Sequence, residues 1–180
     1  MNAVECITGR RSIRSFTDRK VSHETIEQIV STASFAPSWK NTQITRYIAV
    51  EDADLKGKIA ESTAGVFAGN GRIISEAPVL VAVTVVYGRS GFERDGSYST
   101  DRKDGWQMFD AGIASEAFCL AAYEQGLGTV IMGIFDRPAL TGLLQIPEDR
   151  ELVALIALGY PAETPDAPKR KGVADLLTYM

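Results

Sequence analysis

The stretch "PVLVAVTVVY", residues 78–87, carries an almost unbroken run of β-branched residues. Such a run is typical of a strand that is buried on both faces of a sheet. The stretches "GTVIMGIF" at 128–135 and "ELVALIALGY" at 151–160 show the same continuous apolar pattern. Together with "TRYIAVE" at 45–51, they predict a sheet of four strands.

Helical patterns alternate with these strands. Ser22 is the expected N-cap of a helix that ends before Pro37, and Asp52 is the expected N-cap of a helix that runs to Ile59. Further helices are expected over residues 2–9, over residues 106–125 and from Asp136 onward. This alternation predicts an α/β or α+β sandwich, and the length fits one domain spanning residues 1–180.

The expected helix from Trp106 to Gln125 is apolar on almost every face. Its centre, "AGIASEAFCLAAY" at 111–123, has Glu116 as its only charge. A helix that is apolar all round must be covered on all sides, which one small domain can hardly provide. The sequence therefore predicts a partner subunit beside this helix, and the proline-rich tail at 161–180 is expected to pack along a surface.

Composition excludes several classes of function. The net charge of −4 argues against a nucleic-acid partner held by a general basic surface. No apolar run reaches membrane-spanning length and no leader pattern is present, so we expect a soluble, cytoplasmic protein. Cys6, Cys119 and His23 are too scattered for a metal site, and the cysteines are expected to be free thiols. With a single histidine and no G-x-S-x-G motif, hydrolytic catalysis has little support.

The stretch "RRSIRSF", residues 10–16, gathers three arginines in an acidic chain. In an extended segment Arg10, Ser12 and Arg14 point to one face, and two guanidinium groups beside a hydroxyl suit a phosphate. The alternative, which composition alone favours, is a solvent-exposed charge run. A second basic group at 169–171 has the same two interpretations: a phosphate contact or a solubilising tail.

Three other stretches are candidates for a binding site. Gly133 ends a predicted strand, where its N–H group could face a flat ligand or its small size could simply allow close packing. "APSWKNTQ" at 36–43 concentrates polar side chains around a tryptophan. The charged, glycine-rich segment at 88–105 has the length of a lid, a binding loop or a disordered segment.

Taken together, four stretches resemble the nitroreductase family of flavin-dependent oxidoreductases, in the family's order and over nearly the whole chain. They are "RRSIRSF" at 10–16, "APSWKNTQ" at 36–43, "GLGTVIMGIFD" at 126–136 and "LGYPAETPDAPKRK" at 158–171. The resemblance implies a mainly antiparallel sheet flanked by helices, and FMN held without a covalent bond between the two subunits of a homodimer. It also implies that the arm at 161–180 extends onto the partner subunit.

The resemblance assigns a role to each candidate residue. Contacts with the phosphate and ribityl chain are expected from Arg10, Arg11, Ser12, Lys169 and Arg170. Arg14 is expected at the pyrimidine edge of the flavin, where a cation raises its electron affinity. Contacts from the other subunit are expected from Pro37, Ser38 and Asn41. Contacts along the ring are expected from Asn70, Met132, Gly133 and Ile134, with the Gly133 N–H group near flavin N5.

The implied activity is electron transfer from NADH or NADPH, through FMN, to a nitroaromatic, a quinone or a similar acceptor by a ping-pong mechanism. No side chain is expected to act as acid, base or nucleophile at N5. One alternative is a specialised member of the family that dehalogenates, reduces alkenes or fragments flavin. Another alternative is a protein that binds or stores FMN without turnover.

Overall fold

The four predicted strands form one antiparallel sheet in the computed structural model, which describes residues 1–180. The strands are β1 (Thr45–Val50), β2 (Val79–Val86), β3 (Gly128–Met132) and β4 (Arg150–Gly159), in the order β1-β2-β4-β3. The continuous apolar strands β2 and β4 are the two central ones, so their side chains are buried on both faces. The sheet predicted from the sequence is therefore confirmed.

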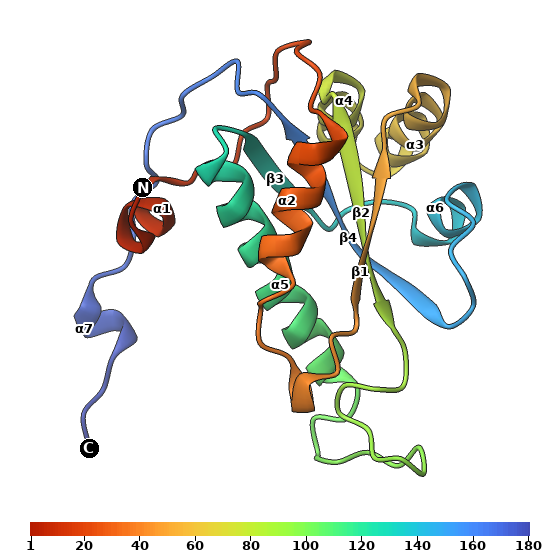
Figure 1. Cartoon of the computed structure of the whole chain (residues 1–180), viewed down its shortest axis with the longest axis vertical. Coiled ribbons are helices and arrows are strands. Elements are labelled where there is room, and N and C mark those ends of the chain that lie inside the picture. Colours follow the sequence, from red (N-terminus) through yellow and green to blue (C-terminus); the bar gives the residue numbers. More distant parts are fainter.

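Helices cover both faces of the sheet (Figure 1). On one face, α2 (His23–Ala33) and α5 (Gly105–Glu124) pack on Val79, Val81 and Val83 of β2. On the other face, Leu80 and Ala82 pack against α3 (Ala53–Val66), α4 (Ala68–Glu76) and α6 (Arg137–Leu143). The remaining helical segments are α1 (Ala3–Gly9), the single turn Trp39–Asn41 and α7 (Val173–Leu176). None of the helices is long and apolar enough to cross a membrane.

The predicted helix caps are present, but several boundaries differ. The side chains of Ser22, Asp52 and Asp136 accept hydrogen bonds from the first turns of α2, α3 and α6. Three boundaries are corrected: α2 ends at Ala33, α3 continues to Val66, and β3 ends at Met132. Helix α4 was not expected at all, because the glycines of "AGNGRIISE" disfavour a helix in isolation.

The long helix α5 has one face on the sheet and one face without cover. Phe118 and Ala122 are fully buried under α2 and the sheet, whereas Phe109 on the opposite face is 59% exposed. The C-terminal arm is also uncovered: it extends away from the sheet and helices in Figure 1, with Leu176 71% and Tyr179 89% exposed. Two apolar surfaces of the single chain thus lack a partner.

Candidate functional site

The arginine stretch and the C-terminal arm meet at a cavity of about 320 Å³. The stretch is held extended because Ser12 pairs with Thr129 of β3, where the Ile13 N–H donates to the Thr129 carbonyl at 2.9 Å. The arm is tied to it by Glu163, whose carboxylate accepts from the backbone N–H of Arg14 at 2.6 Å. The cavity is lined by Arg10, Arg11, Ser12, Arg14, Pro165, Asp166, Pro168 and Arg170.

Four arginines face one carboxylate in this cavity, which therefore suits an anion. Arg10 has an incomplete set of partners: its Nε lies 3.4 Å from Glu116 of α5 but is buried and forms no hydrogen bond. Arg11 is partly used elsewhere, because its Nη1 donates to the carbonyls of Thr8 and Arg10 at the end of α1. The incomplete pairing of Arg10 is the kind of contact that a phosphate group would complete.

The two C-terminal candidates are placed differently. Arg170 lines the cavity, whereas Lys169 does not. From Asp166 onward the chain around them is exposed, so neither residue is fixed by packing. The sequence could not distinguish these neighbouring cations, and the structure assigns the cavity position to Arg170.

The Gly133 turn lies directly after the opposite end of β3. β3 is an edge strand. It leads from Thr129, beside the arginine cavity, to Gly133, about 13 Å away. No atom lies within 4 Å of where a Gly133 Cβ would stand, and the Gly133 N–H group makes no hydrogen bond. The buried side chain of Asn70 fixes the turn by donating from Nδ2 to the Ile134 carbonyl at 3.0 Å.

The side chains of the turn differ in what they can contact. Ile134 is 52% exposed, whereas the Met132 side chain is buried in the core. Only the backbone of Met132 can therefore face a ligand. The nearest charged residues are already engaged: the Asp136 carboxylate caps α6, and Arg137 pairs with Glu151 at 2.8 Å.

The predicted contacts from the 36–43 stretch lie apart from this cavity within the single chain. Pro37, Ser38 and Asn41 do not line the arginine cavity. Their loop is fixed at the start of α5, where the Trp39 N–H donates to both carboxylate oxygens of Asp110 at 3.1 Å. Three non-glycine residues of this loop have a left-handed backbone, namely Lys40, Asn41 and Gln43. Strain of this kind concentrates at functional sites.

Comparisons with known proteins show the family of the chain. The family model described as the nitroreductase family matches residues 7–72 and 67–160. The chain belongs to the nitroreductase family. It is 34% identical to a protein of Archaeoglobus fulgidus, provisionally named NADH dehydrogenase/NAD(P)H nitroreductase, over 91% of this chain and 87% of that protein. The FMN reductase [NAD(P)H] of Bacillus subtilis is 31% identical over 89% of this chain and 66% of its own length.

A solved structure confirms the fold of this chain. The hypothetical oxidoreductase YcnD of Bacillus subtilis superposes with a TM-score of 0.86 and 29% identity. The match covers 100% of this chain and 76% of YcnD. The family resemblance and the antiparallel α+β fold predicted from the sequence are thus both confirmed.

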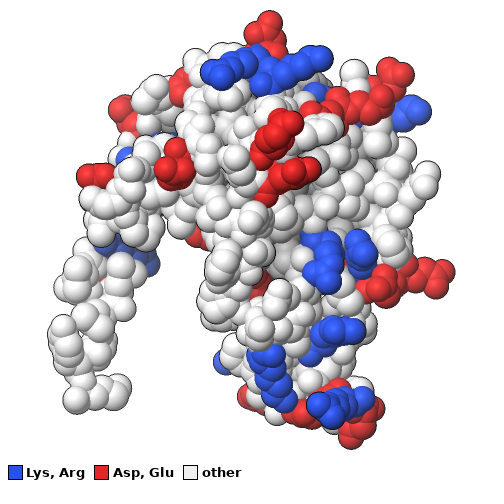
Figure 2. Space-filling view, in the orientation of Figure 1, with Lys and Arg blue, Asp and Glu red and all other residues white.

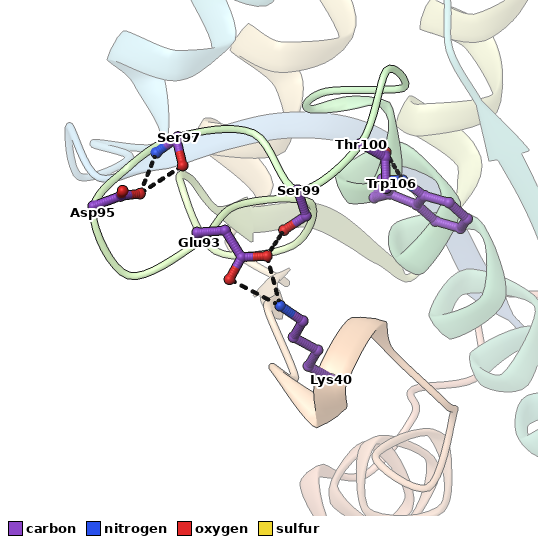
Figure 3. Close-up of polar contacts among 7 residues, drawn as sticks. All are labelled: Lys40, Glu93, Asp95, Ser97, Ser99, Thr100 and Trp106. Atoms are coloured by element: carbon purple, nitrogen blue, oxygen red, sulfur yellow. Dashed lines mark hydrogen bonds and ion pairs between the residues drawn. The ribbon is translucent and has the colours of Figure 1, made fainter.

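The 88–105 segment is a loop fixed beside the 36–43 stretch (Figure 3). The Glu93 carboxylate accepts from Lys40 Nζ at 2.9 and 3.1 Å and from Ser99 Oγ at 2.6 Å. Trp106 Nε1 donates to Thr100 Oγ1 at 2.8 Å, and the Trp106 ring lies 4.8 Å from that of Trp39. The hydrogen bonds from Ser99 and Lys40 lower the pKa of Glu93, so this tether is fully charged at neutral pH.

We expect Glu93→Gln to loosen this loop. The substitution keeps an acceptor for Ser99 but removes the charge that holds Lys40. Because the ion pair between Lys40 and Glu93 is exposed, its loss should change the Tm little. The rate of amide hydrogen exchange at residues 91–99 should rise by about two- to fivefold. Hydrogen exchange followed by mass spectrometry measures this.

A matched control is Glu76→Gln, which removes an exposed ion pair with Arg72 far from the loop and should leave its exchange unchanged. Because the pKa of Glu93 is lowered, its ion pair with Lys40 contributes fully above the usual pKa of a glutamate. The contribution is lost only as the pH falls through the lowered pKa. If the wild-type loop at neutral pH exchanged its amide hydrogens as fast as the loop of Glu93→Gln does, this account would be contradicted.

The two thiols and the imidazole of the chain line neither the arginine cavity nor the space beside Gly133. Burial raises the pKa of Cys119 to about 11, and burial is also the main cause of the raised pKa of Cys6. His23 is exposed at the start of α2, where a hydrogen bond with Glu51 raises its pKa. The site is therefore built from arginines, backbone groups and an amide.

Proposed function

We propose that this chain is an FMN-dependent oxidoreductase that transfers electrons from NADH or NADPH to a nitroaromatic, a quinone or a similar oxidised acceptor. The observation that carries this proposal is the edge of β3, which has an arginine cavity beside its start and an open glycine turn after its end. A ligand with a phosphate at one end and a flat ring at the other matches these two features. The relative that is 31% identical is named for FMN and NAD(P)H.

The residues present fit FMN. The phosphate would be held by Arg10, Ser12 and Arg170, and it would give the buried Arg10 Nε the hydrogen bond that this atom lacks. The ring would lie on the Gly133 turn, where the free Gly133 N–H can donate to flavin N5 and Asn70 holds the turn in place. FMN, when bound, supplies the ability to accept a hydride and to release electrons to a second substrate.

We further propose that the active unit is a homodimer. The outer face of α5 and the end of the arm, at residues 173–180, expose large apolar side chains in one chain. A second copy can cover both, and it would bring Pro37, Ser38 and Asn41 of its strained loop to the flavin. Arg14, which lines the cavity near Ser12, is assigned to the pyrimidine edge of the ring.

Residues 132–134 carry no ionisable side chain that could act on the ring. With one open face over the ring, the donor and the acceptor should use the same space in turn. This arrangement gives ping-pong kinetics, with parallel double-reciprocal lines. The chain's own residues would bind and orient FMN, and neither thiol nor the imidazole would move a proton.

The test is anaerobic mixing of the purified protein with NADH and with NADPH, followed by absorbance near 450 nm. We expect a yellow protein with about one FMN per subunit that one or both donors bleach and that air restores. Colourless protein that cannot be reconstituted with FMN would overturn the cofactor assignment. Bound FMN that neither donor reduces would favour a storage protein.

Steady-state kinetics with a quinone acceptor test the mechanism. The control variants are His23→Ala and Cys119→Ala. Each should keep its turnover within about threefold of the wild type, because neither side chain faces the Gly133 turn. Intersecting double-reciprocal lines, or loss of flavin reduction in His23→Ala with FMN still bound, would reveal a second site or a missed side chain.

A further inference from the structure

A second group of arginines lies at the opposite end of the sheet. Arg46 follows the first residue of β1, Arg150 begins β4, and Arg89 stands just after β2. They share a cavity of about 220 Å³. The two cavities are distinct. Residue 158 of β4 pairs with Thr129, beside the first cavity, and residue 150 of the same strand lies about 26 Å from residue 158.

Protein groups balance only part of the charge of this second cavity, because Asp149 is the one carboxylate among three arginines that line it. Neither Arg46 nor Arg89 forms an ion pair, and Arg150 has only Asp149, whose carboxylate lies 3.9 Å from Nε. That distance is too long for a hydrogen bond. Three guanidinium groups around one small space repel each other unless an anion lies between them. The excess positive charge therefore indicates a bound anion.

Two buried polar atoms on the lining residues also lack partners. Thr42 Oγ1 and Arg150 Nε are both buried and form no hydrogen bond. A buried donor without an acceptor is costly, and an anion with several acceptor oxygens would remove that cost for both groups. The cavity is lined by Thr42, Ile44, Arg46, Val86, Arg89, Asp149 and Arg150.

The frame that carries these groups is rigid. The Val86 N–H donates to the Ile44 carbonyl and the Tyr87 N–H donates to the Asp149 carbonyl, each at 2.9 Å. Arg46 Nη1 is fixed by the carbonyls of Gln43 and Thr45 at 2.7 and 2.8 Å, which leaves its other N–H groups free. Figure 2 shows basic side chains gathered over the lower part of the visible face, where β1 begins and β2 ends in Figure 1.

We propose that this second cavity binds a phosphate group. Its volume is below the roughly 300–1,000 Å³ of sites that enclose a drug-sized ligand, so it fits one phosphate rather than a whole nucleotide. Guanidinium groups and a hydroxyl are the donors that phosphate oxygens accept from in a paired geometry. The phosphate can be inorganic phosphate or the 2′-phosphate of NADPH, whose other parts would lie outside the cavity.

The first experiment titrates sodium phosphate into the purified protein at constant ionic strength, by calorimetry, with sodium chloride as the blank. Arg89→Gln and Arg150→Gln should each weaken phosphate binding by about tenfold, since each removes one charge-assisted contact. Arg102→Gln, which removes an exposed arginine outside the cavity, should not. Absence of phosphate heat above the blank, or binding unchanged in both cavity variants, overturns the proposal.

The second experiment separates the two sources and rests on the proposed function. If the 2′-phosphate is the ligand, Arg89→Gln raises the KM for NADPH by about tenfold and leaves the KM for NADH unchanged. If inorganic phosphate is the ligand, neither KM changes although the titration is weakened. A protein that neither donor reduces would refute the oxidoreductase proposal, while the calorimetric result would still decide this one. If Arg10→Ala abolishes phosphate binding and Arg89→Gln leaves it unchanged, the phosphate binds in the first cavity and the proposal is overturned.

Discussion

Replacing Arg10 by alanine should lower the affinity for FMN by about a hundredfold. The substitution removes a charge-assisted contact to the phosphate and also frees the Glu116 carboxylate, which stands 3.4 Å from Arg10 Nε. An unpaired carboxylate beside the cavity repels a phosphate, so the two losses act in the same direction. The dissociation constant, measured by quenching of flavin fluorescence on adding apoprotein, reports the effect.

Two matched variants separate these contributions. Arg10→Lys keeps the charge but not the planar fork, and its affinity should lie between those of the wild type and Arg10→Ala. Glu116→Gln removes the competing carboxylate and should bind FMN at least as tightly as the wild type. Wild-type affinity in Arg10→Ala would show that the phosphate lies elsewhere.

Arg14→Ala should behave in the opposite way to Arg10→Ala. FMN binding should weaken only moderately, while the midpoint potential falls by about 30 mV, the shift that accompanies a tenfold change in a two-electron equilibrium. The cause is the loss of the cation assigned to the pyrimidine edge. A potential equal to that of the wild type would mean that Arg14 serves only the phosphate end.

Truncation after Thr164 should weaken the dimer by at least about a hundredfold and release FMN. It removes the exposed apolar residues of the arm, each of which stabilises an interface when buried, together with Arg170 of the cavity. The domain itself should still fold, because Glu163 remains to hold the arginine stretch and the arm beyond it lies outside the core. Light scattering and the flavin content after gel filtration measure the two effects.

A shorter truncation separates the two functions of the arm. Ending the chain at Gly172 keeps Arg170 but removes α7 and the apolar residues after it, so the dimer should weaken more than the phosphate contact. Arg170→Ala should do the reverse. A chain truncated after Thr164 that remains a dimer with bound FMN would refute the role assigned to the arm.

The parts of this fold that are predictable from sequence are those that depend on local chemistry. The apolar run 79–86 is sufficient to predict a central strand, and the caps at Ser22, Asp52 and Asp136 mark helix starts because a side-chain acceptor is visible in the sequence. For the arginine stretch, local chemistry left an anion site and a solvent-exposed charge run as the two interpretations. Its resemblance to a family then decided between two open interpretations.

The parts that could not be predicted depend on tertiary contacts. Helix α4 forms despite its glycines because it packs closely on α3, where a Cβ on Gly71 would stand 2.7 Å from the Ala60 carbonyl oxygen. The order of the 88–105 loop depends on Lys40, more than fifty positions away from Glu93. Glu116 stood out as the only charge of the stretch 111–123, but its pairing with Arg10 was not visible. The second arginine cavity joins residues from three strand ends, and no local motif connects them.

In the proposed dimer, the C-terminal arm couples the retention of FMN to the association of the two subunits. In the proposed dimer one segment of twenty residues carries both a cation for the phosphate and the apolar contacts to the other subunit. Any ligand that binds only the assembled form stabilises that form, and the assembled form in turn retains the ligand. Subunit concentration and flavin supply are then two controls over one equilibrium. On this proposal, a dilute preparation should lose its colour through dissociation rather than unfolding, and added FMN should restore the dimer.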